Sequence, residues 1–505
     1  MKKIVVAVVV VVLALLVAPW GVGKVAEKRL NVGLDKLVEE APYLKVVERK
    51  WTGGWFKSEQ VVTFEAFGDL MELLNPEAIK DAMKKDAADA NGDMEPGEPA
   101  VAAAPDAVPP SEAPADDGSV SEKMHDLMRF TVRNEILHGP VLGLSGFGIA
   151  RVDTHLVLSE EVRKKIVEIF GPKDPLEVST RVAFTGGGTT TFTSEGRTIK
   201  PDKKSELSWE TFKLAIGYSR GADKYDLDGA MPKFEATNPE DKMHFVLKDL
   251  TLDGDGKRVR GDLYDGDFTF KVASMNVEGD GNQFEIADLH YIVESATKND
   301  FTSMGAKLGS GAVKNPQLSG LGVELKEIHY DFSVRHLHTE TLEKLLAGIK
   351  AMYAKPLTST LEAEKVMFAP FKEQGAELLK YDPELSIDRI GIVTGDGDGY
   401  LTGLMTVKGA TAEDFATGSM SLVGKLHADI TLDVSEKMIQ KFPNGSMGVA
   451  AGVDGGYLQR KGDRLICKIV FDKGALTVNG KPQAIPGLGG PPPMDLPAEG
   501  PPPQE

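Results

Sequence analysis

Hydrophobic positions form two patterns in this chain. Near the N-terminus they are continuous from Ile4 to Val22, and every position between Lys3 and Lys24 is uncharged. Beyond about residue 129 they mostly alternate with polar positions. A run of about 20 apolar residues predicts a membrane-spanning helix, and alternation predicts strands with one apolar and one polar face. We therefore expect a membrane anchor at residues 4–23, followed by a large β-rich body.

The anchor could instead be a cleaved signal peptide, and two observations favour an uncleaved span. Signal cleavage requires small residues just before the cut, but Leu16 is bulky and Pro19 would follow a cut after Ala18. Trp20 suits the membrane–water interface at the end of a span. No cysteine stands directly after the run, which excludes a lipoprotein anchor.

Orientation depends on basic residues flanking the run. Lys2 and Lys3 favour a cytoplasmic N-terminus, whereas Lys24, Lys28 and Arg29 oppose it. Because long domains translocate largely regardless of charge, and because the start resembles a bacterial signal-anchor, we expect the body to lie in the periplasm.

Strands with one polar face are typical of antiparallel sheets. Many consecutive strands with few helices between them predict a large meander, interrupted by a helical pair at residues 340–381 with Thr339 as N-cap and Pro370 as a kink. We expect this pair to pack on the apolar face of the sheet. A helix at 25–40 and a short helix from Ser435 to Pro443 complete the prediction. Five strands have the clearest apolar faces. These faces are Val152, Thr154, Leu156 and Leu158; Phe268, Phe270 and Val272; Ile328, Tyr330, Phe332 and Val334; Met420, Leu422, Leu426, Ile430, Leu432 and Val434, in a strand over 420–434; and Leu465, Cys467, Ile469 and Phe471.

Aromatic residues gather early in the body, at Trp51, Trp55 and Phe56, around a turn at Gly53 and Gly54. We interpret them as the start of the core, and a ligand or membrane contact is the alternative.

Composition changes this picture in two segments. Residues 84–122 are rich in Ala, Pro, Asp and Glu, and the tail from Pro486 is rich in Pro. Such segments bury too little apolar surface to fold, so we expect disorder in both. The predicted fold is α+β, mainly β, divided as follows: 1–3, cytoplasmic N-terminus; 4–23, anchor; 24–83, helix and first strands; 84–122, acidic insertion; 123–339, antiparallel sheet; 340–382, helical pair; 383–484, C-terminal strands; 485–505, tail.

The net charge of −18, without basic clusters, argues against nucleic acid as a partner. Cys467 is the only cysteine, so the chain has no internal disulfide, and its place on an apolar strand face predicts inert packing. We expect no cofactor and no metal site.

Catalytic motifs are lacking. No Gly-Lys pair precedes Ser or Thr as in a P-loop, and Phe147 stands where a nucleophile elbow around Ser145 needs glycine. The acidic segments beginning at Asp253 and Asp396 resemble calcium loops but lack the spacing of an EF-hand, so we interpret both as tight turns.

Three histidines merit attention. His336 and His338 would share a strand face, as a metal pair does, but the sequence nominates no third ligand. His138, before Gly139 and Pro140, is interpreted as a hydrogen-bonded turn residue, with catalysis as the alternative.

Several segments together resemble the YdgA-like family of bacterial proteins, a domain of unknown function. They are Trp55–Ser58, Glu135–Pro140, Asp174–Leu176, Val334–Leu337 and Leu476–Lys481. The most specific are the His-Gly-Pro element at 138–140 and the Asn-Gly-Lys element at 479–481. The resemblance implies an inner-membrane anchor, a periplasmic body and self-association, and it supplies no catalytic residues.

Three functional hypotheses follow. The first is a non-enzymatic envelope protein whose curved sheet binds or carries a lipid or another apolar ligand, with the bilayer contacted through residues 4–23. The second is a self-associating scaffold, with a homo-oligomer as the assembled form, and the third is a hydrolase. An open apolar groove would favour the carrier. A sheet whose apolar face is filled by the helices at 340–381 would favour the scaffold. Polar groups that converge around His138 or His336 would favour the enzyme.

Overall fold

In a computed structural model, the structure describes residues 23–39, 41–66, 128–143, 146–201, 204–353, 360–411, 413–414 and 419–484. The apolar run up to Val22, the 84–122 insertion and the 485–505 tail lie outside these residues. Among the described residues, no helix is long and apolar enough to cross a membrane.

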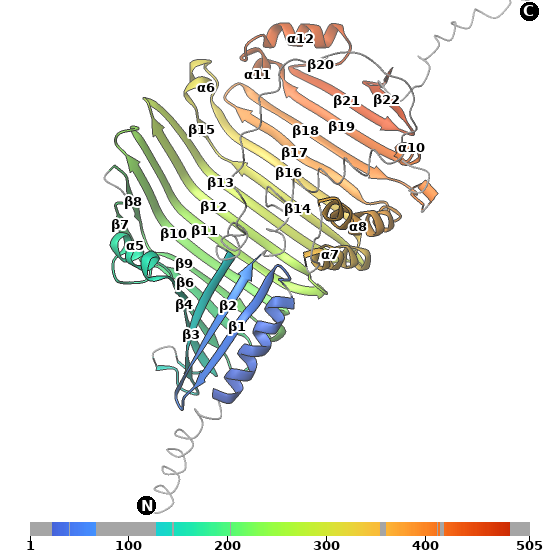
Figure 1. The fold of residues 1–505 in the computed structure, drawn as a ribbon. Coiled ribbons are helices and arrows are strands. Elements are labelled where there is room, and N and C mark those ends of the chain that lie inside the picture. Colours follow the sequence, from blue (N-terminus) through green and yellow to red (C-terminus); the bar gives the residue numbers. More distant parts are fainter. Residues whose placement is uncertain are drawn as a thin grey trace, which may run out of the picture. The chain divides into compact units, whose positions relative to one another are not determined.

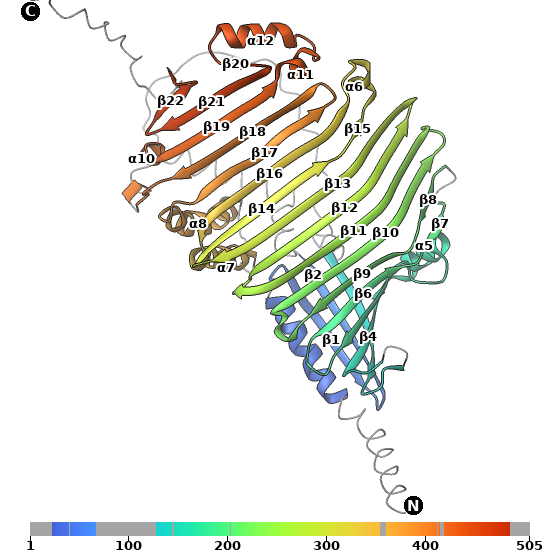
Figure 2. The same ribbon diagram turned by 180° about the vertical axis from the view of Figure 1, so that it is seen from behind.

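The chain forms two compact units. Unit 1 comprises Met1–Lys164, Val178–Phe184 and Leu346–Lys372, and unit 2 comprises Lys165–Glu177, Thr185–Leu345 and Glu373–Glu505. Each unit contains antiparallel strands and a few helices, as the alternation predicted. Figures 1 and 2 show the strands from opposite sides.

Unit 1 is an antiparallel meander in which each strand pairs with the next. A helix at residues 23–39 precedes it, as predicted for 25–40. The strands are β1 Leu44–Gly53, β2 Lys57–Ala66, β3 Arg129–His138, β4 Ala150–Val157 and β5 Glu177–Val182.

The N-terminal helix packs on this meander through a small core and a polar ladder. Ala26 is 2% exposed and clusters with buried Ile136 and Val152. The ladder runs across the strands from the helix: Gln60 Nε2 donates to Asn31 Oδ1 at 3.1 Å, Asn134 Nδ2 donates to Gln60 Oε1 at 3.0 Å, and Thr154 Oγ1 donates to Asn134 Oδ1 at 2.8 Å. These buried amides are satisfied only in one register, so the ladder fixes the helix on the sheet.

Unit 2 holds a longer antiparallel sheet, paired in the order β6, β9, β10, β11, β12, β13, β14, β16, β17, β18, β19, β21, β22 and β23. Its elements are β6 Gly188–Ser194, β7 Arg197–Ile199, β8 Glu206–Trp209, β9 Phe212–Tyr218, a 3-10 turn Arg220–Ala222, β10 Lys224–Asn238, β11 Met243–Arg260, β12 Leu263–Gly279, β13 Asn282–Lys298, β14 Phe301–Ser310, β15 Val313–Lys314, α6 Pro316–Gly320, β16 Leu325–His338, β17 Glu384–Thr394, β18 Gly397–Val407, α10 Ser419–Val423, β19 Leu426–Ser435, α11 Glu436–Gln440, α12 Gly445–Asp454, β20 Gln459–Lys461, β21 Arg464–Asp472, β22 Ala475–Val478 and β23 Lys481–Gln483.

Three helices span the boundary between the units in sequence: α5 Glu160–Phe170, α7 Thr339–Tyr353 and α8 Thr360–Leu379, which contains Pro370. The predicted pair at 340–381 is confirmed as α7 and α8. The alternation analysis missed α5 and also α12.

One strand boundary was wrong. The predicted strand 420–434 begins only at Leu426, because residues Ser419–Val423 form α10 and Gly424 and Lys425 form a turn. Met420 and Leu422 therefore do not belong to the strand face. The short helix after Ser435 is confirmed as α11, with the Ser435 side chain accepting from the Met438 amide.

The compact core of unit 2 lies at one end of its sheet. Val434, Met438, Val449 and Leu465 form a buried cluster where α11 and α12 meet β19 and β21. Leu465 is fully buried there, because α11 and α12 pack over this part of the sheet.

Candidate functional site

A patch of half-exposed apolar side chains lies in the middle of the unit 2 sheet. Its members lie on four neighbouring strands, β13, β14, β16 and β17, and are 38–46% exposed. We call this set the open patch: Tyr291, Met304, Leu308, Tyr330, Phe332 and Leu385.

Strand register places the open patch on a single face. Leu308 lies opposite Tyr291 on one side and Tyr330 on the other. A second row joins Met304 to Val334 and Val334 to Leu385. Because partners directly opposite each other in a ladder point to the same face, these rows form one continuous apolar surface.

The opposite face of the same strands is charged. Lys307, next to Leu308 in sequence, is paired with Glu294 at 2.8 Å, and Arg389 is paired with Asp331 at 3.2 Å. A sheet with one charged face normally buries the other in a core. Here the second face is apolar but remains half-exposed.

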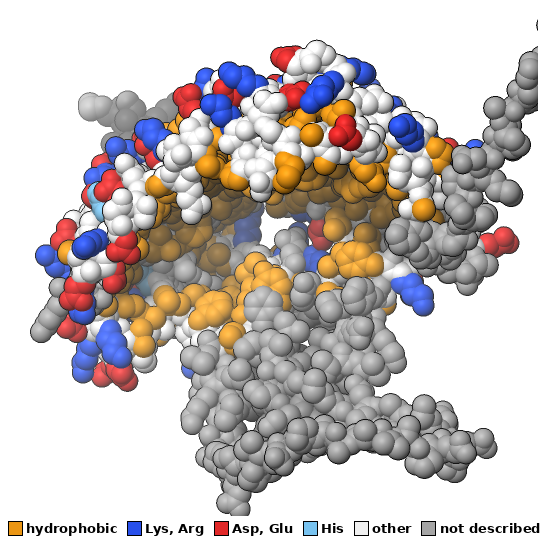
Figure 3. Space-filling model, turned by 90° about the horizontal axis from the view of Figure 1, so that it is seen from above, with side chains coloured by type: hydrophobic (Ala, Val, Ile, Leu, Met, Phe, Trp, Pro, Cys, Tyr) orange, Lys and Arg blue, Asp and Glu red, His pale blue; other side chains and the backbone are white. Residues whose placement is uncertain are grey.

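Figure 3 shows this contrast within the sheet. Hydrophobic side chains line its hollowed inner side, and charged side chains gather on the outer side. With about 200 Å² for a large side chain, six side chains at 38–46% exposure leave roughly 500 Å² of apolar surface open. Patches of this size on soluble proteins are often binding sites.

The helical pair was expected to pack on the apolar face of the sheet, and the polar contacts of α7 with unit 2 lie at strand ends. At the start of α7, the Thr339 amide donates to the Asp300 carbonyl at 2.9 Å, in the turn between β13 and β14. Glu343 of α7 accepts from Arg260 Nε at 2.5 Å, at the end of β11. These contacts place the start of α7 beside strand ends, and the open patch is 38–46% exposed.

His336 and His338 do not form a metal pair with a third ligand. His336 stacks on Phe301 with ring centroids 4.0 Å apart, and His338 stacks on Tyr381, also at 4.0 Å. His336 has φ 59°, which interrupts the strand alternation that placed both rings on one face. In the described part of the chain, no group of three or more His, Cys, Asp or Glu residues could hold a metal ion.

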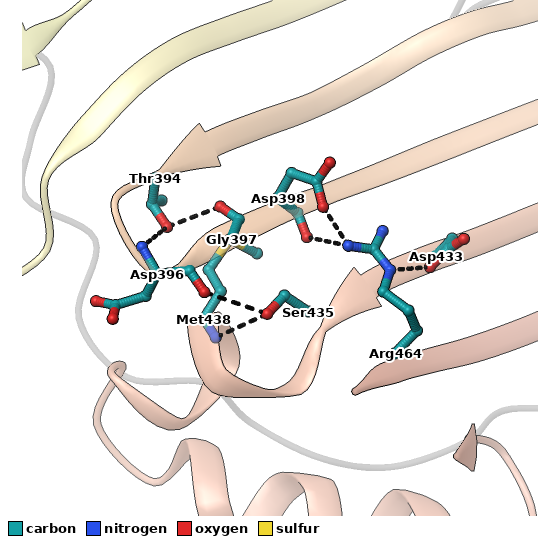
Figure 4. A network of polar contacts seen from close by, with 8 residues as sticks. All are labelled: Thr394, Asp396, Gly397, Asp398, Asp433, Ser435, Met438 and Arg464. Atoms are coloured by element: carbon teal, nitrogen blue, oxygen red, sulfur yellow. Dashed lines mark hydrogen bonds and ion pairs between the residues drawn. The ribbon is translucent and has the colours of Figure 1, made fainter. Parts of the chain in front are cut away.

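The two acidic segments have different structures. Asp396 lies in the tight turn from β17 to β18, as predicted, and its carboxylate pairs with Lys437 at 2.8 Å. Hydrogen bonding to Lys437 holds the pKa of Asp396 below its usual range. Arg464 bridges Asp398 and Asp433, as Figure 4 shows. The carboxylates of this segment are thus paired with basic side chains.

The turn predicted at Asp253 is wrong. Asp253 and Asp255 lie inside β11, and the glycines between and after them meet the next strands closely. A Cβ at Gly256 would lie 2.2 Å from the Tyr225 ring, so glycine here admits an aromatic neighbour rather than a turn. Cys467 is buried on β21, and burial raises the pKa of its thiol, consistent with the predicted inert packing.

Comparison with known families now adds to this geometry. A family model described as a bacterial protein of unknown function (DUF945) matches residues 1–486. The chain belongs to the DUF945 family. A search of curated proteins found no match, and a search of solved structures found none either.

In this DUF945 chain, the His-Gly-Pro element has a packing role. His138 is 3% exposed, its Nε2 lies 2.9 Å from Ser58 Oγ, and its Nδ1 lies 3.1 Å from the Trp55 carbonyl oxygen. Both ring nitrogens are occupied by neighbouring groups within unit 1. This agrees with a hydrogen-bonded turn residue.

The Asn-Gly-Lys element closes the last hairpin. Asn479 and Gly480 have φ 51° and 79°, as a tight turn between β22 and β23 requires. The Asn479 side chain donates to the carbonyl oxygens of Gly456 and Tyr457, both at 3.0 Å, and accepts from the Lys468 amide at 2.8 Å. It therefore fastens the loop after α12 to the end of the sheet.

Sequence reasoning named two members of the open patch, Tyr330 and Phe332, as strand-face residues, but not as a site. It missed Tyr291, Met304, Leu308 and Leu385. These residues were missed because the sequence does not show how exposed a side chain is. Alternation shows which face of a strand a side chain occupies, and not whether anything covers that face.

Proposed function

We propose that this protein is an envelope protein, anchored in the bacterial inner membrane by residues 4–23, that binds or carries a lipid or similar apolar ligand on the open patch. The observation that carries the proposal is the half-exposed row Tyr291, Leu308 and Tyr330, with side chains 40%, 44% and 46% exposed on one face. Covering an apolar surface of this kind with an acyl chain lowers the free energy, because the apolar surface is removed from water.

Dimensions support an acyl chain as the ligand. Four strands at about 4.8 Å spacing cover about 15 Å. An acyl chain in one leaflet is also about 15 Å long, half of a hydrocarbon core of about 30 Å. The patch thus accommodates one chain laid across the strands, and the charged outer face keeps the sheet soluble.

The proposal places the N-terminus in the cytoplasm and the body in the periplasm, and includes the YdgA-like relationship with its inner-membrane location. The role is binding rather than catalysis. A phosphatase that is active only outside the cytoplasm, fused to the C-terminus, tests the orientation. Activity is expected, and an inactive fusion with an active N-terminal fusion would reverse the topology.

Mass spectrometry of organic extracts tests ligand binding. The full chain is purified from its native host and compared with a row variant carrying Tyr291→Gln, Leu308→Gln and Tyr330→Gln. Lys307→Gln is the matched control, because Lys307 neighbours Leu308 on the same strand and its side chain is also 44% exposed, but on the charged face. Lipid that surrounds the proposed anchor at residues 4–23 is present in all three proteins, so a difference between them reports lipid bound to the body.

A lipid class near one per protein in the unmodified chain and in Lys307→Gln, and depleted in the row variant, is the expected result. Equal lipid in all three would refute the carrier. If the row variant instead changed a dimer into a monomer at equal lipid content, the scaffold hypothesis would replace it.

A further inference from the structure

A second apolar surface lies at one end of unit 1, on two neighbouring turns. Trp55 and Phe56, between β1 and β2, are 50% and 49% exposed. Val141 and Phe147, between β3 and β4, are 50% and 70% exposed. We call these four residues the tip. The interpretation of Trp55 and Phe56 as core residues is therefore wrong, whereas Trp51 does pack against the unit 1 core.

Main-chain contacts join the first turn to the end of β3 and close the second turn on itself. The His138 amide donates to the Phe56 carbonyl at 2.8 Å, and Val141 bridges to Phe147. Leu142, next to Val141, is fully buried beneath the turn. The four tip side chains are thus exposed beside backbone that is paired at His138, Val141 and Phe147.

The tip adjoins the point where the apolar run enters the body. Gly23, directly after that run, packs so tightly on His138 that a Cβ would lie 2.4 Å from His138 Cε1. His138 in turn contacts the carbonyl oxygens of both Trp55 and Phe56. The end of the predicted membrane span and the backbone of the Trp55–Phe56 turn therefore meet at one buried histidine.

We propose that the tip inserts into the interface of the same bilayer that residues 4–23 span, as a second membrane contact. This proposal rests on the proposed anchor. Tryptophan and other aromatic rings favour the headgroup region, and exposed Lys57, next to Phe56, suits anionic phosphates there. Two adjacent contacts, one spanning and one interfacial, fix the orientation of unit 1 against the membrane.

Tryptophan quenching by brominated lipids tests this in the full chain. The protein is reconstituted in vesicles of phosphatidylethanolamine and phosphatidylglycerol brominated near the headgroup end of the acyl chains. The chain contains Trp20, Trp51, Trp55 and Trp209. Three variants keep Trp51 and one other tryptophan, with Phe at the remaining two positions.

The variant keeping Trp55 is expected to lose much of its emission in brominated vesicles, as the Trp20 variant does, whereas the Trp209 variant loses little. Quenching of Trp20 without Trp55 would overturn the tip proposal and leave the anchor intact. Absence of quenching at Trp20 would overturn the anchor itself, and with it the tip proposal.

A paired substitution separates insertion from folding. Val141→Ser with Phe147→Ser should abolish the Trp55 quenching without changing the far-ultraviolet circular dichroism. Met447→Ser is the matched control, because Met447 is 67% exposed but belongs to unit 2, and it should leave the quenching unchanged. Unchanged Trp55 quenching in the folded paired variant would contradict a contact made by the tip.

Discussion

The row variant, with Gln at Tyr291, Leu308 and Tyr330, should weaken binding of an acyl ligand by roughly one hundredfold. Full burial of one large apolar side chain contributes about 1.5–3 kcal/mol. These three retain 40–46% of their surface for a ligand to cover, which corresponds to about 1 kcal/mol each. Loss of about 3 kcal/mol is roughly a hundredfold in Kd, since about 1.4 kcal/mol equals tenfold.

The assay is a fluorescence titration of the full chain in detergent with a dansyl-labelled fatty acid. Detergent competes equally in each variant, so the ratio of Kd values remains informative. Lys307→Gln should bind within about twofold of the unmodified chain, because Lys307 contacts Glu294 on the opposite face and a surface ion pair contributes only about 0–1 kcal/mol.

Fold integrity is a separate readout. The substituted side chains are only partly buried, unlike Val272, which is 1% exposed, so circular dichroism should show a folded row variant. Equal Kd values for a folded row variant and the unmodified chain would refute the assignment of the ligand to the open patch.

Three further predictions concern the fold and are read by chemical denaturation of the full chain. Ser58→Ala should lower the free energy of unfolding by about 1–3 kcal/mol, because it leaves buried His138 Nε2 without its partner. An unchanged free energy of unfolding would contradict a stabilising role for this hydrogen bond. Asp414→Asn should destabilise at neutral pH, because hydrogen bonding to Lys425 holds the pKa of Asp414 below its usual range. That stabilisation is present above about pH 4 and disappears as pH falls toward the lowered pKa, so a difference that persists in strong acid would contradict it. Asn479→Ala should cost about 1–3 kcal/mol through three lost hydrogen bonds, whereas an unaffected midpoint would show that the last hairpin is not fastened by this side chain.

Much of the strand content could be predicted because the rule behind it is local. Ile328, Tyr330, Phe332 and Val334 share a face whatever else the chain does. The same local rule failed at Met420, where the alternation continued in sequence but a turn at Gly424 and Lys425 separated it from β19. Asp249 illustrates a further limit: its φ of 50° within β11 shifts the apolar positions from Phe245 and Leu247 to Leu250.

The open patch could not be predicted because it depends on what is absent above a face. Tyr330 and the inward residue of an ordinary core strand have the same pattern in sequence. Only the exposed fraction of the side chain, 46% for Tyr330, distinguishes the two. For Trp55, the sequence raised a ligand or membrane contact as the alternative to a core position, and the exposure of its side chain excludes the core position.

Photo-crosslinking in the native host tests the central claim most directly. Cells are fed a photoactivatable fatty acid that enters their lipids, the full chain is purified after irradiation, and crosslinked peptides are mapped. The account predicts acyl adducts on β13, β14, β16 and β17, which carry the open patch, in addition to adducts on residues 4–23. Adducts confined to residues 4–23, at equal recovery of the sheet peptides, would contradict it.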